Sequence, residues 1–217
     1  MIEKYLVKKI TEPVDWKVTV PGSKSMTNRA LLMAVLSAGT VRVEGVLFSD
    51  DSRHFLACLV ALGFTVEIEE EKKVRDRDGL RRQDSPREAV IDVGSAGTAA
   101  RFLAAMLGFS DGCYEIRCSA QMKRRPMAEL FDLLSGAGAK ITFLEEEGHL
   151  PVRITGCRYA RADKTAGETP RELSLDITKS TQFLSALLLI APMVPEGMKI
   201  HITSEKTDAH TSASRGR

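Results

Sequence analysis

Apolar and polar positions recur in the same order at three places along the chain. Each place has a polar start, a nearly all-apolar helical stretch, a glycine and a short alternating strand; the segments are NRALLMAVLSAGTVRVEGV from Asn28, ARFLAAMLGFSDGCYEIRC from Ala100 and TQFLSALLLIAPMVPEGMKIHIT from Thr181. When the segments are aligned, Arg29, Arg101 and Gln182 take the same position. This pattern predicts an internal three-fold repeat.

A second kind of helix is expected between these segments. It is indicated by two stretches with apolar residues at helical spacing, DSRHFLACLVALGFTVEIEE from Asp51 and PMAELFDLLSGAGAKITFLEEE from Pro126. Gly63 or Gly138 ends each helix, where a positive φ is common, and a strand that ends in acidic residues follows. The unit is therefore roughly strand, helix, strand, helix, strand. Helices of the first kind are apolar on nearly every side, so we expect them to be central and walled by sheets.

Two stretches depart from this pattern. Residues 69–88 carry almost no apolar side chains, which predicts a solvated hairpin or loop. Residues 204–217 contain no Leu, Ile, Val, Phe or Met, which predicts a disordered tail.

Composition and charge narrow the class of protein. The chain has 217 residues, 43% of them hydrophobic, and a formal net charge of +2, which gives no reason to expect nucleic acid as a partner. The longest apolar run is shorter than the roughly 20 residues that span a bilayer, and the first residues do not resemble a secretory signal, so we expect a cytoplasmic protein without a membrane partner. The spacing of the cysteines and histidines matches no metal motif, so we expect no metal site.

The starts of the apolar helices carry the candidate chemistry. A helix N-terminus offers unpaired backbone N–H groups and a partial positive charge, which suit phosphate or carboxylate. The stretch VPGSKSMTNRALLMAVL adds Lys24, Ser25 and Arg29 to this environment. An equally simple interpretation is that a hydroxyl only caps the helix and the two cations are exposed.

The other two repeats favour a binding role for these starts. DVGSAGTAARFL places Gly97 and Thr98 ahead of Arg101, so small residues let a ligand approach the backbone, and DITKSTQFLSALL supplies Ser180, Thr181 and Gln182. Three such starts on one side would form a pocket for a small polyanionic, hydroxylated ligand.

A basic run adds further candidates. QMKRRPMAEL places Arg125 immediately before Pro126, which suits the first turn of a helix. In isolation, the favoured interpretation of this run is a solvated basic surface. Proximity to the other helix starts would reverse that preference.

Four motifs occur together along the chain: PGSKSMTNRALL, GSAGTAARFL, MKRRPMAEL and STQFLSALLLIAP. In this order they resemble the 5-enolpyruvylshikimate-3-phosphate synthase family, also called 3-phosphoshikimate 1-carboxyvinyltransferases, over about residues 5–203. The resemblance implies an α/β fold of repeated βαβαββ-type units, with buried parallel helices surrounded by sheets. It also implies transfer of enolpyruvyl from phosphoenolpyruvate to the 5-hydroxyl of shikimate 3-phosphate, through a tetrahedral adduct and with no cofactor.

The resemblance assigns roles to the matching residues. Lys24 would contact phosphoenolpyruvate and take part in proton transfer as the catalytic residue. The other matches would bind substrate: Ser25 and Arg29 hold shikimate 3-phosphate, Gly97, Thr98 and Arg125 line the phosphoenolpyruvate side, and Ser180, Thr181 and Gln182 grip shikimate 3-phosphate. Arg101 joins this set because it aligns with Arg29 in the repeat.

The family has two similar domains with the active site between them, and we expect this chain to supply the first. Residues 1–17 would be a strand that joins the missing second domain or self-associates, residues 18–203 the shikimate-3-phosphate-binding domain, and residues 204–217 the tail. The family's acidic proton acceptor lies in the second domain, so we expect this chain to be inactive alone. Ser95 and Phe102 replace the Asn and Pro that are usual in the family.

Two alternatives stay open. One is a noncatalytic binding subunit that needs a second chain. The other is the sister enzyme that transfers enolpyruvyl to UDP-N-acetylglucosamine. The sequence KSMTNR argues against this enzyme, because that branch of the family resembles KNAALP at the same position.

Overall fold

A computed structural model describes residues 20–69, 73–76, 87–157, 171–178, 180–194 and 197–203 of the chain. The expected strand in residues 1–17, with its self-association, and the expected tail in residues 204–217 lie outside the described residues. Those assignments, and the domain boundaries drawn from them, stay predictions.

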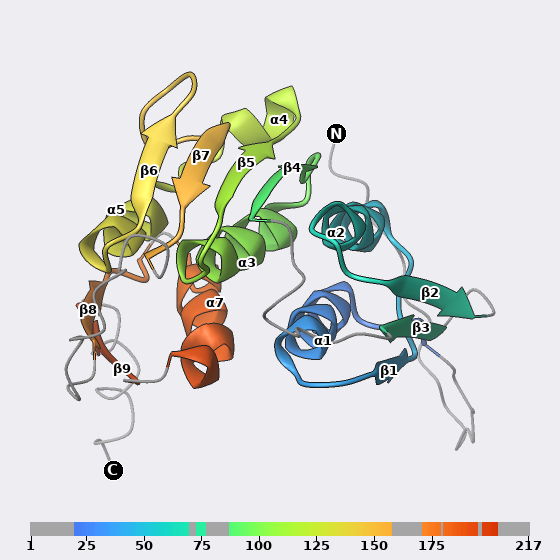
Figure 1. The fold of residues 1–217 in the computed structure, drawn as a ribbon. Helices are drawn as coiled ribbons and strands as arrows, with labels where there is room; N and C mark the ends of the chain where they lie inside the picture. The colour runs from blue at the N-terminus through green and yellow to red at the C-terminus, as the bar shows by residue number, and fades with distance from the viewer. Residues whose placement is uncertain are drawn as a thin grey trace, which may run out of the picture.

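The two kinds of helix expected from the apolar pattern are both present (Figure 1). Helices of the first kind are each followed by a strand: α1 (Lys24–Leu36) by β1 (Val41–Glu44), α3 (Gly97–Gly108) by β5 (Cys113–Arg117), and α7 (Gln182–Ile190) by a 3₁₀ turn, η1 (Ala191–Met193), and β9 (Met198–Ile202). Helices of the second kind each precede a hairpin: α2 (Asp50–Ala61) with β2 (Val66–Glu69) and β3 (Lys73–Asp76), and α5 (Ala128–Gly136) with β6 (Lys140–Phe143) and β7 (Val152–Thr155). Strand β4 (Glu88–Asp92) precedes α3, β8 (Arg171–Leu175) precedes α7, and the short α4 (Ala120–Lys123) lies before α5.

The sheets repeat one topology. The described strands form sheets in the order β1-β3-β2, β4-β5-β7-β6 and β8-β9. Strand β5 pairs with β7 and β7 with β6, all antiparallel, as β1 pairs with β3 and β3 with β2. Strands β4 and β5 are parallel on either side of α3 in the sequence, as β8 and β9 are around α7. The second repeat thus contains the whole βαβαββ unit, and the expected α/β fold class is confirmed. In the described part of residues 69–88, β3 pairs with β2 as the second strand of a hairpin that begins before that stretch.

Helix α3 forms the centre of the core. All of its residues except Thr98 are buried, because α1, α2, α5 and α7 pack around it. Helices α1 and α7 contact α3 with one face, while Met26, Met33 and Leu188 on their other faces are exposed. Helix α3 is therefore buried on nearly every side, as predicted. Helices α1 and α7 are covered on one side by the described elements.

Local details at the helix ends mostly follow the sequence. Gly63 and Gly138 end α2 and α5 with φ of +87° and +96°, a conformation that favours glycine. Pro126 differs from expectation: α5 begins at Ala128, so the proline precedes the helix and lies outside its first turn. Within the described ranges, every helix is too short or too polar to span a lipid bilayer.

Candidate functional site

The start of α1 is fixed by Ser23 and Thr27, which are not among the candidate site residues. Helix α1 begins at Lys24, and the Ser23 hydroxyl caps it by accepting a hydrogen bond from the Met26 N–H (3.4 Å). The buried Thr27 hydroxyl accepts a hydrogen bond from the Leu47 N–H (3.1 Å), which ties α1 to the segment before α2. The capping role therefore belongs to Ser23, and Lys24 and Ser25 lie in the first turn.

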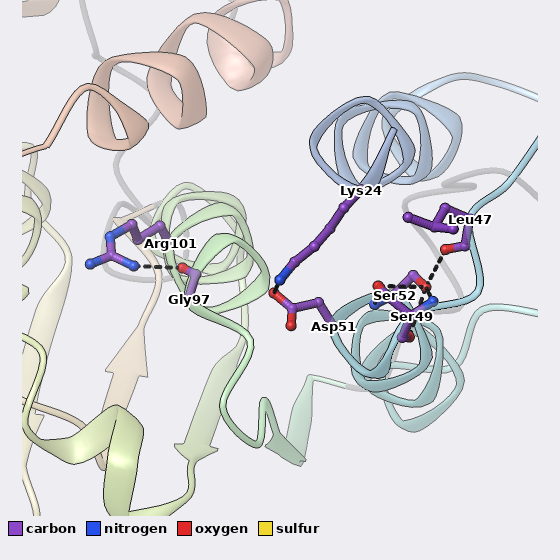
Figure 2. Close-up of polar contacts among 7 residues, drawn as sticks. All are labelled: Lys24, Leu47, Ser49, Asp51, Ser52, Gly97 and Arg101. Carbon is purple, nitrogen blue, oxygen red and sulfur yellow. Dashed lines mark hydrogen bonds and ion pairs between the residues drawn. The ribbon is translucent and has the colours of Figure 1, made fainter. Parts of the chain in front are cut away.

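Lys24 is held by an acidic residue from the start of α2. Its Nζ lies 3.0 Å from Oδ2 of Asp51, and the Lys24 side chain is 52% exposed while that of Asp51 is 18% exposed (Figure 2). Ser49 and Ser52 form a capping box that fixes the first turn of α2, and the Ser52 hydroxyl also donates to the Leu47 carbonyl (2.6 Å). An anion that binds Lys24 must therefore compete with a carboxylate whose position is fixed.

Arg29 connects the three apolar helices. Its Nη1 donates to the carbonyl and the hydroxyl of Ser25, and its Nη2 donates to the Ser185 hydroxyl on α7 (3.2 Å). Its Cζ lies 5.6 Å from the centroid of the Phe102 ring on α3. Ser25 and Arg29, which were predicted to act together, are thus in direct contact.

Two guanidinium groups converge on the start of α3. The Nη1 of Arg101 donates to the Gly97 carbonyl (2.8 Å; Figure 2), and a Cβ placed on Gly97 would lie 2.8 Å from that nitrogen and 2.5 Å from Nη1 of Arg125. Ala96, the N-cap residue, provides no side-chain hydrogen bond to the helix. The first turn of α3 therefore combines an uncapped helix N-terminus with two cations.

The electrostatics of this turn favour an anion. Arg101 is only 8% exposed, and burial lowers its pKa, with the nearby charge of Arg125 lowering it further. Among the residues that the structure describes, Nε of Arg101 has no hydrogen-bond partner, and no carboxylate forms an ion pair with Arg101 or Arg125. A bound anion would relieve both the repulsion and the burial cost.

The start of α7 lies beside these groups. The Ser180 hydroxyl accepts a hydrogen bond from the Gln182 N–H (3.2 Å), and Thr181 is the N-cap residue, with an exposed side chain. Gln182 immediately precedes Phe183, over whose ring Arg101 lies at 5.4 Å. Ser180, Thr181 and Gln182 therefore lie one to three positions before Phe183, which contacts Arg101, and three to five positions before Ser185, which bonds to Arg29.

The basic run before α5 divides into separate roles. Lys123 pairs with Glu145, whereas Arg124 and Arg125 are both exposed. The interpretation as a solvated surface therefore fits Arg124, while Arg125, although exposed, places its guanidinium beside Gly97 at the start of α3. The Ser95 hydroxyl shares a hydrogen bond with the Ser119 hydroxyl just before α4 (2.8 Å).

The sequence interpretation missed four side chains that hold the predicted ones in place. Asp51 pairs with Lys24, Ser185 bonds to Arg29, and Phe102 and Phe183 lie under the two arginines. All four contacts join different helices, and nothing local in the sequence indicated them.

The comparisons with known proteins agree on one family. A family model described as EPSP synthase (3-phosphoshikimate 1-carboxyvinyltransferase) matches residues 8–213. A 3-phosphoshikimate 1-carboxyvinyltransferase of Vibrio campbellii is 40% identical over 193 residues, and one of Sulfurovum sp. is 41% identical over 195 residues. Each match covers 88% of this chain and 43% of the relative. A solved EPSP synthase of Acinetobacter baumannii has a TM-score of 0.66 and 27% identity, covering 80% of this chain and 37% of that one. The chain thus spans less than half the length of these relatives.

Proposed function

Since the chain belongs to the EPSP synthase (3-phosphoshikimate 1-carboxyvinyltransferase) family, we propose that it forms the shikimate-3-phosphate-binding half of such an enzyme's active site. The reaction would transfer enolpyruvyl from phosphoenolpyruvate to the 5-hydroxyl of shikimate 3-phosphate and release phosphate. Because the chain spans 43% of the length of its relatives, we expect turnover to need the remaining part of the enzyme.

The observation that carries this proposal is the environment of Gly97. Two guanidinium groups, those of Arg101 and Arg125, face this glycine at a helix start that no side chain caps. An absent side chain, backbone N–H groups at a helix start without a side-chain cap, and uncompensated positive charge together suit a phosphate or carboxylate at close range. Both proposed substrates carry such groups.

The other predicted residues have complementary roles in this proposal. Lys24, a compact and mobile cation, contacts phosphoenolpyruvate and moves a proton during formation and breakdown of the tetrahedral adduct. Arg29, fixed by Ser25 and Ser185, presents its remaining N–H donors to shikimate 3-phosphate. Thr98 supports the phosphoenolpyruvate side, and Ser180, Thr181 and Gln182 bind the phosphate and ring of shikimate 3-phosphate.

The alternatives lead to different expectations. The comparisons do not favour transfer to UDP-N-acetylglucosamine, since the relatives reported above are named for 3-phosphoshikimate. A binding subunit that acts with a second chain remains compatible with the proposal, because the half-site would be the same. No cofactor is part of the proposed reaction. The cytoplasmic location of the protein, expected from its sequence, stays a prediction.

Complementation tests the proposed activity. The chain would be mixed with the part of the Vibrio campbellii relative that it does not match, and phosphate release would be measured with both substrates. We expect release only when both chains and both substrates are present, and an Arg125→Ala chain should lower it at least tenfold. Mixtures that bind each other but release no phosphate above the single chains would contradict the proposal.

A further inference from the structure

Two buried aromatic rings lie under Arg29 and Arg101, two of the three arginines of the candidate site. The guanidinium carbon of Arg29 lies 5.6 Å from the centroid of Phe102, and that of Arg101 lies 5.4 Å from the centroid of Phe183. Phe102 is 0% exposed and Phe183 is 1% exposed, so packing fixes both rings. These distances are within the range in which a cation is attracted to a ring face.

The two contacts follow the internal repeat. Arg29 and Arg101 occupy equivalent positions, and the residues that follow the equivalent positions are Ala30, Phe102 and Phe183. The arginine of the first repeat therefore lies over the ring of the second, and the arginine of the second lies over the ring of the third. In the third repeat, Gln182 takes the position of the arginine, and in the first repeat, Ala30 takes the position of the phenylalanine. This remaining pair therefore provides neither a cation nor a ring.

A ring differs from a carboxylate in its effect on a binding site. Asp51 neutralises Lys24, so a ligand must displace that carboxylate before it gains the lysine. The partners of Arg29 and Arg101 among the described residues are hydroxyls, carbonyls and rings, all of them uncharged. A ring thus restricts the guanidinium without cancelling its charge.

We propose that Phe102 and Phe183 are positioning residues, which orient Arg29 and Arg101 for an anionic ligand while leaving both positive charges uncompensated. For Phe102 this gives a physical role to a residue that departs from the family pattern. The proposal rests on the proposed function for the identity of the ligand, which is shikimate 3-phosphate. The orientation of the arginines does not depend on that identity.

The first test needs no ligand. Nitrogen-15 relaxation of the arginine side-chain Nε–Hε groups would be measured in the whole 217-residue chain, in Phe102→Leu and in Phe183→Leu. We expect lower order parameters for Arg29 in the first variant and for Arg101 in the second. Unchanged order parameters in both variants would overturn the proposal.

A fluorinated series separates the electrostatic role of the ring from its packing. Phenylalanine with one, two or three ring fluorines, introduced at position 102, keeps nearly the same shape while its face becomes less attractive to a cation. We expect Arg29 to become progressively more mobile at unchanged melting temperature. A fall in melting temperature without any change at Arg29 would show a packing role alone and would overturn the proposal. The fluorinated series tests the positioning role of Phe102 even if the leucine variants do not fold.

The second test adds the ligand. Calorimetric titration with shikimate 3-phosphate should give about threefold to tenfold weaker binding for Phe102→Leu and Phe183→Leu. Phe48→Leu is the matched control, because Phe48 lies under Arg53 on α2 at 5.6 Å and should change the affinity little. An equal loss in all three variants would overturn the proposal. If the unaltered chain does not bind shikimate 3-phosphate, the proposed function fails, and the relaxation data alone then decide the role of the rings.

Discussion

Gly97 lies where a side chain would displace two guanidinium groups. Its φ is not in the left-handed region, and the atoms that a Cβ would meet are the side-chain ends of Arg101 and Arg125 and not backbone. We therefore expect Gly97→Ala to fold normally and to bind phosphoenolpyruvate roughly tenfold more weakly, about 1.4 kcal/mol, in an NMR titration. The loss follows because the methyl group fills the space at the helix start and moves both cations.

The matched control is Gly136→Ala in α5. A Cβ at Gly136 meets nothing within 4 Å, and its backbone is helical, so alanine should stabilise the helix by roughly 0.5–1 kcal/mol and leave binding unchanged. Equal affinities for Gly97→Ala and the unaltered chain would show that no ligand approaches this backbone.

Asp51 determines how readily Lys24 can bind an incoming anion. Exposed ion pairs contribute about 0–1 kcal/mol, so the pair is weak enough to be displaced, and removal of the carboxylate also removes repulsion of an incoming anion. We expect Asp51→Asn to bind phosphoenolpyruvate about twofold to fivefold more tightly at low salt. Asp50→Asn removes the same charge from the same helical turn and should have a smaller effect. Tighter binding by both variants to the same degree would assign the gain to net charge instead of to the Lys24–Asp51 pair.

The residues of the candidate site were predictable to the extent that their signals are local. The hydroxyls and cations at the helix starts are visible in the sequence, because an N-terminal turn needs capping groups and attracts anions. The bond from Arg29 to Ser185 joins residues 156 positions apart, and the rings under both arginines come from other repeats. Such contacts depend on how the helices pack, which the pattern of one helix does not specify.

At the scale of elements, the first turn of α2 connects the fold to the site. Ser52 is fully buried; its hydroxyl accepts from the Ser49 N–H (2.8 Å) and donates to the Leu47 carbonyl (2.6 Å). Alanine at position 52 would remove both bonds, while the bond from the Ser49 N–H to the Leu47 carbonyl (3.0 Å) would remain, so we expect Ser52→Ala to lower the free energy of unfolding by about 1–1.5 kcal/mol in urea. Ser135→Ala, at an exposed position of α5, should change it by less than about 0.5 kcal/mol. Similar values for both would show that the capping box contributes little.

The outer face of the sheet β4-β5-β7-β6 carries a pH-dependent contact. Glu115 on β5 accepts hydrogen bonds from Arg117 (2.8 Å) and from Arg153 on β7 (3.1 Å). These bonds lower the pKa of Glu115 below its ordinary value of 4.5, and the bond from Arg117 has the larger effect. The carboxylate therefore stabilises the fold above about pH 4.5, and this contribution is lost as the pH falls through the lowered pKa.

Replacement of this carboxylate should flatten the acid side of the stability profile. Because Glu115→Gln lacks the contribution at every pH, its stability in urea should fall less between pH 7 and pH 3 than that of the unaltered chain. Glu88→Gln, on the same face of the sheet, keeps Glu115 and should keep the steeper fall. Equal slopes for the unaltered chain and Glu115→Gln would show that the contact is absent in solution.

The order of the elements was the most predictable part of the fold. Helical spacing and the glycines at 63 and 138 are local, so they indicated both kinds of helix and the strand after each of them. The pattern did not indicate that β3 and β7 lie between the other strands of their sheets, because hairpin placement depends on which strand edge is free. The pattern also overestimated the burial of α1 and α7, because an all-apolar sequence does not indicate how many other described elements pack around a helix.

At the scale of the whole molecule, the repeat places three helix starts around one region. Arg29 bonds to α7 and lies over α3, Arg101 lies over α7, and Arg125 reaches Gly97. The central claim is that these starts form one half-site for shikimate 3-phosphate. That claim concerns binding by this chain and is independent of turnover.

The most direct test is a nitrogen-15 NMR titration of the chain with shikimate 3-phosphate at low salt, repeated with Arg29→Ala and with Arg53→Ala as the control. We expect saturable shifts at Ser25, Arg29 and residues 180–182 that vanish in Arg29→Ala and persist in Arg53→Ala. A well-dispersed spectrum that does not respond to shikimate 3-phosphate, or shifts that survive Arg29→Ala unchanged, would contradict a half-site at these helix starts.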